Sequence, residues 1–240
     1  MTTAAGFIFT PSAPSISMET LTDLENILKQ DRQRNDRAGE AETLARIGNL
    51  YRQRREWTRA VNSYKNALKI YTEMEDAAAK AAVTACLGTV FWEQAQVNKA
   101  IHCFEQALEV LSETGDAEAQ RMVRAILGIS FWRRGDWNRA LALVEEAMPI
   151  GQSSVPEPYR PLRKALEKAV PQLEQRVRAA QTNNNPLRLM QAHFALIPLC
   201  LCMGKKEEAA IHLNQAESLA RQLQQENISR IFPKLQSLMD

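Results

Sequence analysis

The sequence predicts an all-α solenoid built from antiparallel helix pairs, and three observations lead to this prediction. Three stretches, which begin at Ile47, Leu87 and Leu127, align without gaps at a period of forty residues. Apolar residues in each stretch recur at spacings of three and four, which places them on one face of a helix. β-Branched residues never alternate over the length of a strand, so a sheet is not expected. Self-similarity at a fixed period of this size indicates a repeat architecture.

A glycine, an aromatic residue and an alanine recur at equivalent positions of each repeat. A helix glycine costs about 0.5–1 kcal/mol relative to alanine. We expect it to be kept because it lets the two helices of a pair approach closely, with an aromatic ring packed against the gap. A short polar break such as residues 94–96 makes the paired helices antiparallel. The recurring residues are Gly48, Gly88 and Gly128, then Tyr51, Phe91 and Phe131, then Ala60, Ala100 and Ala140.

The remaining segments are predicted around these three units. Residues 1–18 contain Pro11, Pro14 and several serines and are expected to form a flexible tail. Residues 19–36 align with the second helix of a unit and are expected to cap the array. The three units then occupy residues 37–152.

A degenerate fourth unit and a C-terminal capping helix, the latter at residues 226–239, are expected within residues 188–240. The fourth unit aligns with the third at an offset of 69 residues rather than forty, which leaves 29 inserted residues. We interpret residues 153–187 as a loop followed by an inserted amphipathic helix. This helix, at residues 160–182, either packs against the solenoid as a spacer or lies in the binding groove and gates it.

The motif that carries the repeat resembles the tetratricopeptide repeat (TPR) family. Leu87, Gly88 and Phe91, followed by Ala100, Phe104 and Ala107, match the family's pattern in the second unit. The period of forty rather than 34 residues resembles the variant with longer helices found in kinesin light chains. The resemblance implies a right-handed superhelix whose first helices line a concave, ligand-binding groove. It also assigns Trp57 and Trp137 to packing.

The family's groove positions, carried over to this sequence, define a candidate partner-binding site. Trp92 and Trp132 occupy equivalent faces of neighbouring units, and tryptophan and arginine are enriched at binding hot spots. Both tryptophans either face a ligand or pack inside the array. Only Asn49 matches the residues with which chaperone-binding members hold a carboxylate, so such a clamp is not expected. The candidate groove residues are Asn49, Arg52, Trp92, Met122, Ile129, Trp132 and Arg133.

Composition and motifs argue against catalysis. No glycine-rich phosphate loop, nucleophile elbow or HExxH motif is present, so we expect neither an enzyme nor a cofactor. The three histidines and four cysteines lack zinc-site spacing, so no metal is expected. The cysteines lie in helix-like segments of a chain without a secretion signal or membrane span, which is typical of a cytoplasmic protein with reduced thiols.

The sequence therefore predicts a non-catalytic adaptor, scaffold or assembly factor that binds a protein or peptide segment in the concave groove. One alternative is a regulatory TPR protein that senses a peptide or other ligand, although no output domain is recognisable. The other is nucleic-acid binding through the arginines between Arg32 and Arg59. Their interleaved acidic residues instead favour a solvated helix face with ion pairs, and the net charge is only +2.

Overall fold

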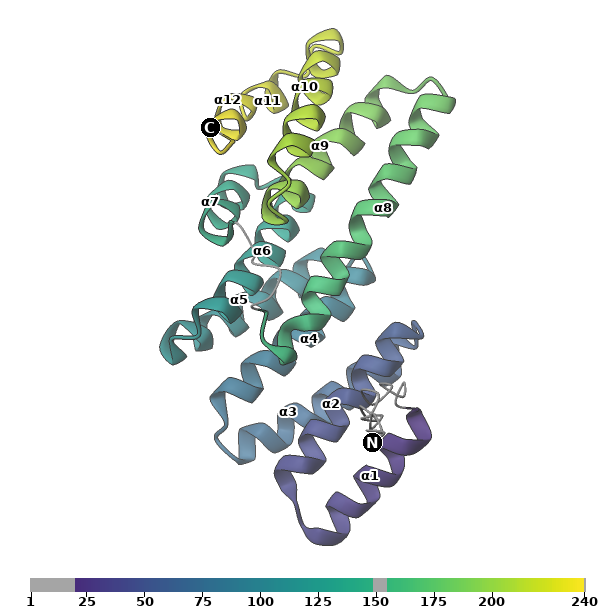
Figure 1. Ribbon diagram of the computed structural model, residues 1–240, viewed down its shortest axis with the longest axis vertical. Helices are drawn as coiled ribbons and strands as arrows, with labels where there is room; N and C mark the ends of the chain where they lie inside the picture. Colours follow the sequence, from purple (N-terminus) through teal and green to yellow (C-terminus); the bar gives the residue numbers. More distant parts are fainter. Residues whose placement is uncertain (1–19, 149–154, 240) are drawn as a thin grey trace, which may run out of the picture.

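The computed structural model describes residues 20–148 and 155–239, and within these ranges every regular element is a helix (Figure 1). The predicted tail at residues 1–18 lies outside the described residues. The helices follow one another as a stack of antiparallel pairs from α1 at one end to α12 at the other. This confirms the predicted all-α array of helix pairs.

The predicted units correspond to successive helix pairs. Helix α1 (Leu21–Arg34) precedes the first pair, and α11 and α12 follow the last. The first three pairs are α2 (Arg37–Gln53) with α3 (Trp57–Glu73), α4 (Ala77–Glu93) with α5 (Val97–Thr114), and α6 (Ala117–Arg134) with α7 (Trp137–Ala147). After a 3₁₀ turn, η1 (Glu157–Tyr159), come α8 (Arg160–Thr182) and the pair α9 (Pro186–Cys202) with α10 (Lys206–Gln222).

Helix boundaries follow repeated local signals. The side chains of Asp36, Asp76 and Asp116 each accept a hydrogen bond from the backbone N–H three residues on, at 2.9–3.0 Å, and so cap α2, α4 and α6. Such a cap contributes about 1 kcal/mol. The loops that end the helices contain residues with positive φ at twenty-residue steps: Asn35, Arg55, Glu75, Ala95, Gly115 and Gly135, then Asn184, Gly204 and Gln224.

The recurring glycines allow close contact between the helices of a pair, as predicted, but the aromatic partner is a different one. A Cβ at Gly88 would lie 2.7 Å from Cε1 of Phe104, and one at Gly48 would lie 2.8 Å from Cε1 of Tyr64. The ring that fills the gap therefore comes from the second helix, not from the aromatic residue three positions after the glycine. In the third unit Val144 takes this place, and the corresponding contact at Gly128 is 3.1 Å.

The aromatic residue three positions after each glycine has another role. A basic side chain eight residues later lies over each of these rings, at 5.5–5.6 Å from the ring centroid. Such cation–π contacts stabilise partly exposed sites by about 0.5–1 kcal/mol. The pairs are Arg59 over Tyr51, Lys99 over Phe91, and Arg139 over Phe131.

The predicted last helix at residues 226–239 is wrong in one respect, because it is broken into two short helices. These are α11 (Glu226–Ser229) and α12 (Phe232–Ser237), with Pro233 at the start of the second. Proline lacks the N–H that a helix interior requires but is tolerated in the first turn, so the helix restarts there. Phe232 and Leu235 are buried, and α12 contacts α10, so this segment still covers the end of the array.

Candidate functional site

The inserted segment packs against the first helices of the second and third units. Helix α8 contacts both α4 and α6 before it pairs with α9 (Figure 1). Tyr159 of η1 and Leu162 and Leu166 of α8 itself are buried, and the thiol of Cys86 on α4 donates to the carbonyl oxygen of Pro158 at 3.4 Å. Helix α8 therefore lies against the first helices of the second and third units, which the family pattern expects to line the groove.

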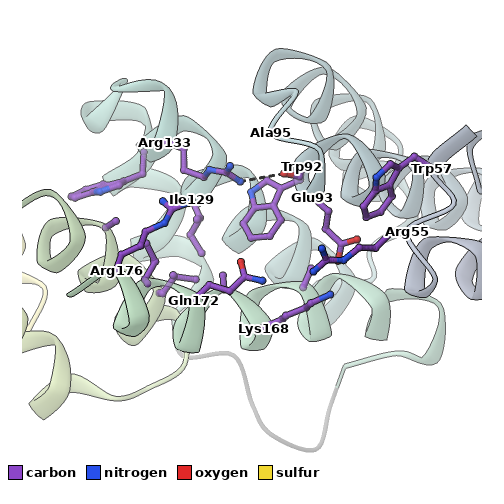
Figure 2. Close-up of a pocket in the computed structure, with 16 residues that line it drawn as sticks. Arg55, Trp57, Trp92, Glu93, Ala95, Ile129, Arg133, Lys168, Gln172 and Arg176 are labelled. Atoms are coloured by element: carbon purple, nitrogen blue, oxygen red, sulfur yellow. Dashed lines mark hydrogen bonds between the residues drawn. The ribbon is translucent and has the colours of Figure 1, made fainter. Parts of the chain in front are cut away.

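A pocket of about 430 Å³ remains where α8 passes the ends of α4 and α6 (Figure 2). Its walls come from the turn between α2 and α3, from α4, α6 and α8, and from α9. A pocket of this volume is within the range of ligand sites. The residues that line it are Arg55, Trp57, Trp92, Glu93, Ala95, Ile129, Trp132, Arg133, Ala165, Lys168, Ala169, Gln172, Leu173, Arg176, Ala195 and Leu199.

Positive charge dominates this pocket. Four of its residues, Arg55, Arg133, Lys168 and Arg176, have no carboxylate partner within 4 Å among the described residues. The one carboxylate of the lining, Glu93, accepts from Arg52 at 2.7 Å. Burial lowers the pKa of the Arg133 guanidinium, and the positive charge of Arg176 lowers it further. The arginines thus repel each other across a site that has no unpaired anion of its own.

Two indole rings line the same pocket with their N–H groups unpaired. Trp92 is 7% exposed and Trp132 is 4% exposed, and neither indole nitrogen has an acceptor among the described residues. A buried donor without a partner costs about 1–3 kcal/mol. The guanidinium of Arg133 lies 4.8 Å from the Trp92 ring centroid and also donates to the Trp92 carbonyl oxygen at 3.3 Å. These contacts hold the cation and the ring together at the pocket wall.

A buried polar network closes the side of the pocket next to the first unit. Arg52 and Glu93 have side chains only 5% and 11% exposed, so their ion pair links α2 and α4 away from water. The hydroxyl of Tyr64 donates to the side-chain oxygen of Asn49 at 2.8 Å. Burial raises the pKa of the Tyr64 hydroxyl well above its usual value, so it stays protonated as a donor.

Comparison with protein families identifies the repeat. Models described as tetratricopeptide repeat match residues 43–78 and 79–153, which are adjacent and include most of the three regular units. Residues 43–153 of the chain are therefore tetratricopeptide repeats. A comparison with curated protein sequences finds no match.

Several solved structures are similar to this TPR protein at low sequence identity. BtubC (BKLC) from P. vanneervenii is 13% identical, with 91% of this chain and 86% of that chain covered and a TM-score of 0.49. A variant of a putative kinesin light chain from Podosopora anserina, with nearly identical TPR-like repeats, is 17% identical, covers 77% of this chain and 96% of that one, and has a TM-score of 0.42.

The pocket of this TPR protein brings together only part of the predicted groove. Trp92, Ile129, Trp132 and Arg133 line it. Asn49, Arg52 and Met122 do not, because the first two belong to the polar network and Met122 is fully buried. A ligand-binding role for any of these residues stays a prediction.

The residues that the inserted helix and the turn between α2 and α3 contribute to the pocket were not predicted from the sequence. Lys168, Gln172 and Arg176 are spaced by four residues, so they share one face of α8, and all three line the pocket. The spacing of four can be seen in the sequence, but which helices this face of α8 meets depends on where α8 lies in the fold. Arg55, in the turn between α2 and α3, and Trp57, the first residue of α3, also line the pocket.

The arginines between Arg32 and Arg59 are partly engaged by carboxylates of the TPR array itself. Arg32 and Arg37 both pair with Glu40 at 2.8 Å, and Arg59 pairs with Glu56 at 2.6 Å. This is the arrangement expected of a solvated helix face, and it gives the nucleic-acid alternative no support. No helix in the described part of the chain is long and apolar enough to cross a membrane.

Two histidines that are distant in the sequence meet in the fourth unit. Nδ1 of His193 on α9 lies 2.9 Å from Nδ1 of His212 on α10, so one ring donates to the other when both are neutral. Burial lowers both pKa values, and the mutual repulsion lowers that of His193 further, whereas Glu208 and Glu174 oppose the effect at His212. Among the described residues, no group of three or more ligating side chains could hold a metal ion.

This pair should make the protein less stable in mild acid. Because both pKa values are lowered on folding, the unfolded chain binds protons first as the pH falls below about 6.5. Stability should therefore be full at neutral pH and decline towards about pH 5, by about 1.4 kcal/mol for each unit of lowered pKa. Urea unfolding at the two pH values should show a smaller decline in His193→Gln/His212→Gln than in the wild type.

A separate carboxylate effect provides a control for this measurement. Arg32, and then Arg37, hold the pKa of Glu40 below its usual value against the opposing effect of burial. Its contribution is lost only as the pH falls below about 4.5, outside the histidine range. An unchanged decline between neutral pH and about pH 5 in the double variant would show that the histidines do not cause it.

Proposed function

We propose that this protein is a non-catalytic adaptor, scaffold or assembly factor that binds a segment of a partner protein at the pocket between α4, α6 and α8. Proteins of the TPR family generally act through protein interactions, and the coarse role of an interaction scaffold follows from these repeats. The finer statement, that the partner enters at this pocket, rests on one observation. This part of the concave face combines an accessible opening with tryptophans and unpaired cations.

The packing of α8 against α4 and α6 supports this location. At the family's groove positions in the second and third units, Ala82, Ala85, Met122 and Ala125 are buried and so are closed to a partner. Of the corresponding first-unit positions, Glu42 is exposed and Ala45 is half-buried. A partner segment that follows the concave face would therefore pass from the open first unit into the pocket and end against α8.

A site-specific photocrosslinker tests the proposal without removing any wall of the pocket. Benzoylphenylalanine at Gln172, an exposed lining residue, should form an adduct with one partner segment in native lysate, identified by mass spectrometry. The matched control carries the crosslinker at Gln106, an exposed glutamine of α5 outside the pocket. The same adducts from both positions, or none from Gln172, would refute the proposed site.

A further inference from the structure

We infer that the pocket between α4, α6 and α8 selects an acidic, extended segment of the partner that carries at least one apolar side chain. This inference rests on the proposed function and adds the chemical class of the ligand. The charge, the aromatic lining and the shape of the pocket each favour such a segment.

Cations without a carboxylate partner face each other across the pocket. Lys168 and Arg176 project from α8, and Arg133 projects from α6 on the opposite wall, as Figure 2 shows. Arg55 adds a fourth cation from the turn between α2 and α3. Within the described residues none of these four has a carboxylate partner, so aspartate or glutamate side chains of a ligand would relieve their repulsion.

Aromatic rings line the pocket together with the cations. The indoles of Trp92 and Trp132 are more than nine-tenths buried, line the pocket and keep unpaired N–H donors. Ile129 and the half-buried Trp57 and Leu173 complete an apolar floor. Rings of this kind accept an apolar side chain, while their N–H groups can bind an oxygen atom of the same ligand.

The shape of the site favours an extended segment over a compact anion. A second pocket, of about 360 Å³, continues along α8 and α9 and shares Leu173, Arg176 and Ala195 with the first. Together the two pockets follow α8 from Ala165 to its end near Asn183. At 1.5 Å per helical residue this is about 27 Å, the length of roughly eight extended residues. Arg188 and Gln191 add a further cation and an amide to the second pocket.

The test uses phage-displayed random peptides of twelve residues as the probe. Wild type should enrich peptides rich in aspartate and glutamate around an apolar residue. The enriched peptide, labelled for fluorescence anisotropy, should bind Lys168→Glu/Arg176→Glu about tenfold or more weakly, because two attractions become repulsions. Its amide analogue, with asparagine and glutamine in place of the acids, should bind wild type about as weakly as the acidic peptide binds the double variant.

A matched variant on the same helix serves as the control. Lys164→Glu/Arg178→Glu makes the same change in net charge on α8, but neither residue lines either of these two pockets, and both are exposed. It should keep wild-type affinity. Enrichment of peptides without acidic bias, no enrichment at all, or equal weakening by both double variants would overturn the inference.

These outcomes separate the inference from the proposed function. A partner crosslinked specifically at Gln172 through a segment without acidic residues would leave the proposed function standing and remove the inference. Acidic peptides that bind at the pocket, combined with no specific adduct at Gln172, would support the ligand chemistry and refute the cellular role.

Discussion

Replacing Glu93 with alanine should lower the free energy of unfolding by about 3 kcal/mol, because it leaves the Arg52 guanidinium buried without a counter-charge. The Arg52 side chain is 5% exposed, so water can solvate it only after local opening. Its Nε already lacks an acceptor among the described residues. Glu93→Gln should lose less, since the amide oxygen still accepts from Arg52. Urea unfolding monitored by circular dichroism measures each change.

A surface ion pair provides the control for Glu93. Glu217 pairs with Arg221 at 2.6 Å, but the Arg221 side chain is 73% exposed. Glu217→Ala should therefore cost less than about 0.5 kcal/mol. If the Glu93 and Glu217 variants lost equal stability, the ion pair between α2 and α4 would not be the buried link between units that its geometry indicates.

Replacing Gly88 with alanine should destabilise the protein by about 2 kcal/mol, although alanine is the better helix former. The new Cβ would lie 2.7 Å from Cε1 of Phe104 and 3.0 Å from Cβ of Cys103, both on α5. Relieving these contacts requires α4 and α5 to separate or the buried ring to rotate. The strain should exceed the gain of about 1 kcal/mol in helix propensity.

Two comparisons isolate the contact with the ring. Gly128→Ala should cost less, because its Cβ would meet Val144 at 3.1 Å rather than an aromatic ring. Adding Phe104→Leu to Gly88→Ala should recover part of the loss, with a coupling energy of about 1 kcal/mol or more in a double-mutant cycle. If the two substitutions had additive effects on the free energy of unfolding, the strain would not arise from contact between the new Cβ and the Phe104 ring.

The fold could be read from the sequence because its information is local and repeated. Gly48, Gly88 and Gly128 mark the same point of each pair, and the loops recur with them. The break between α11 and α12 was missed because the apolar spacing continues across Pro233, and only the missing N–H interrupts the helix. The periodicity of the apolar residues does not show where a backbone N–H is missing.

Only part of the pocket lining could be predicted from the sequence, and the reason is different. Trp92, Ile129, Trp132 and Arg133 could be placed on one face from the repeat register. Lys168 and Arg176 belong to an insertion outside that register, so the sequence does not indicate which helices α8 crosses. The pairing of His193 with His212 depends on the same kind of information, namely the contact between two helices of the degenerate unit.

The twenty-residue step of the loops has a consequence for how this chain tolerates changes in length. The step from Gly135 to Asn184 is 49 residues, that is, one step of twenty and 29 inserted residues. The inserted segment therefore lies between the third and fourth helix pairs, and the three regular pairs keep their aspartate caps and glycine contacts. One extra residue inside α4 would instead rotate everything after it by about 100° and carry Gly88 away from Phe104. Duplications of whole pairs and insertions between pairs are thus the length changes that this architecture can inherit.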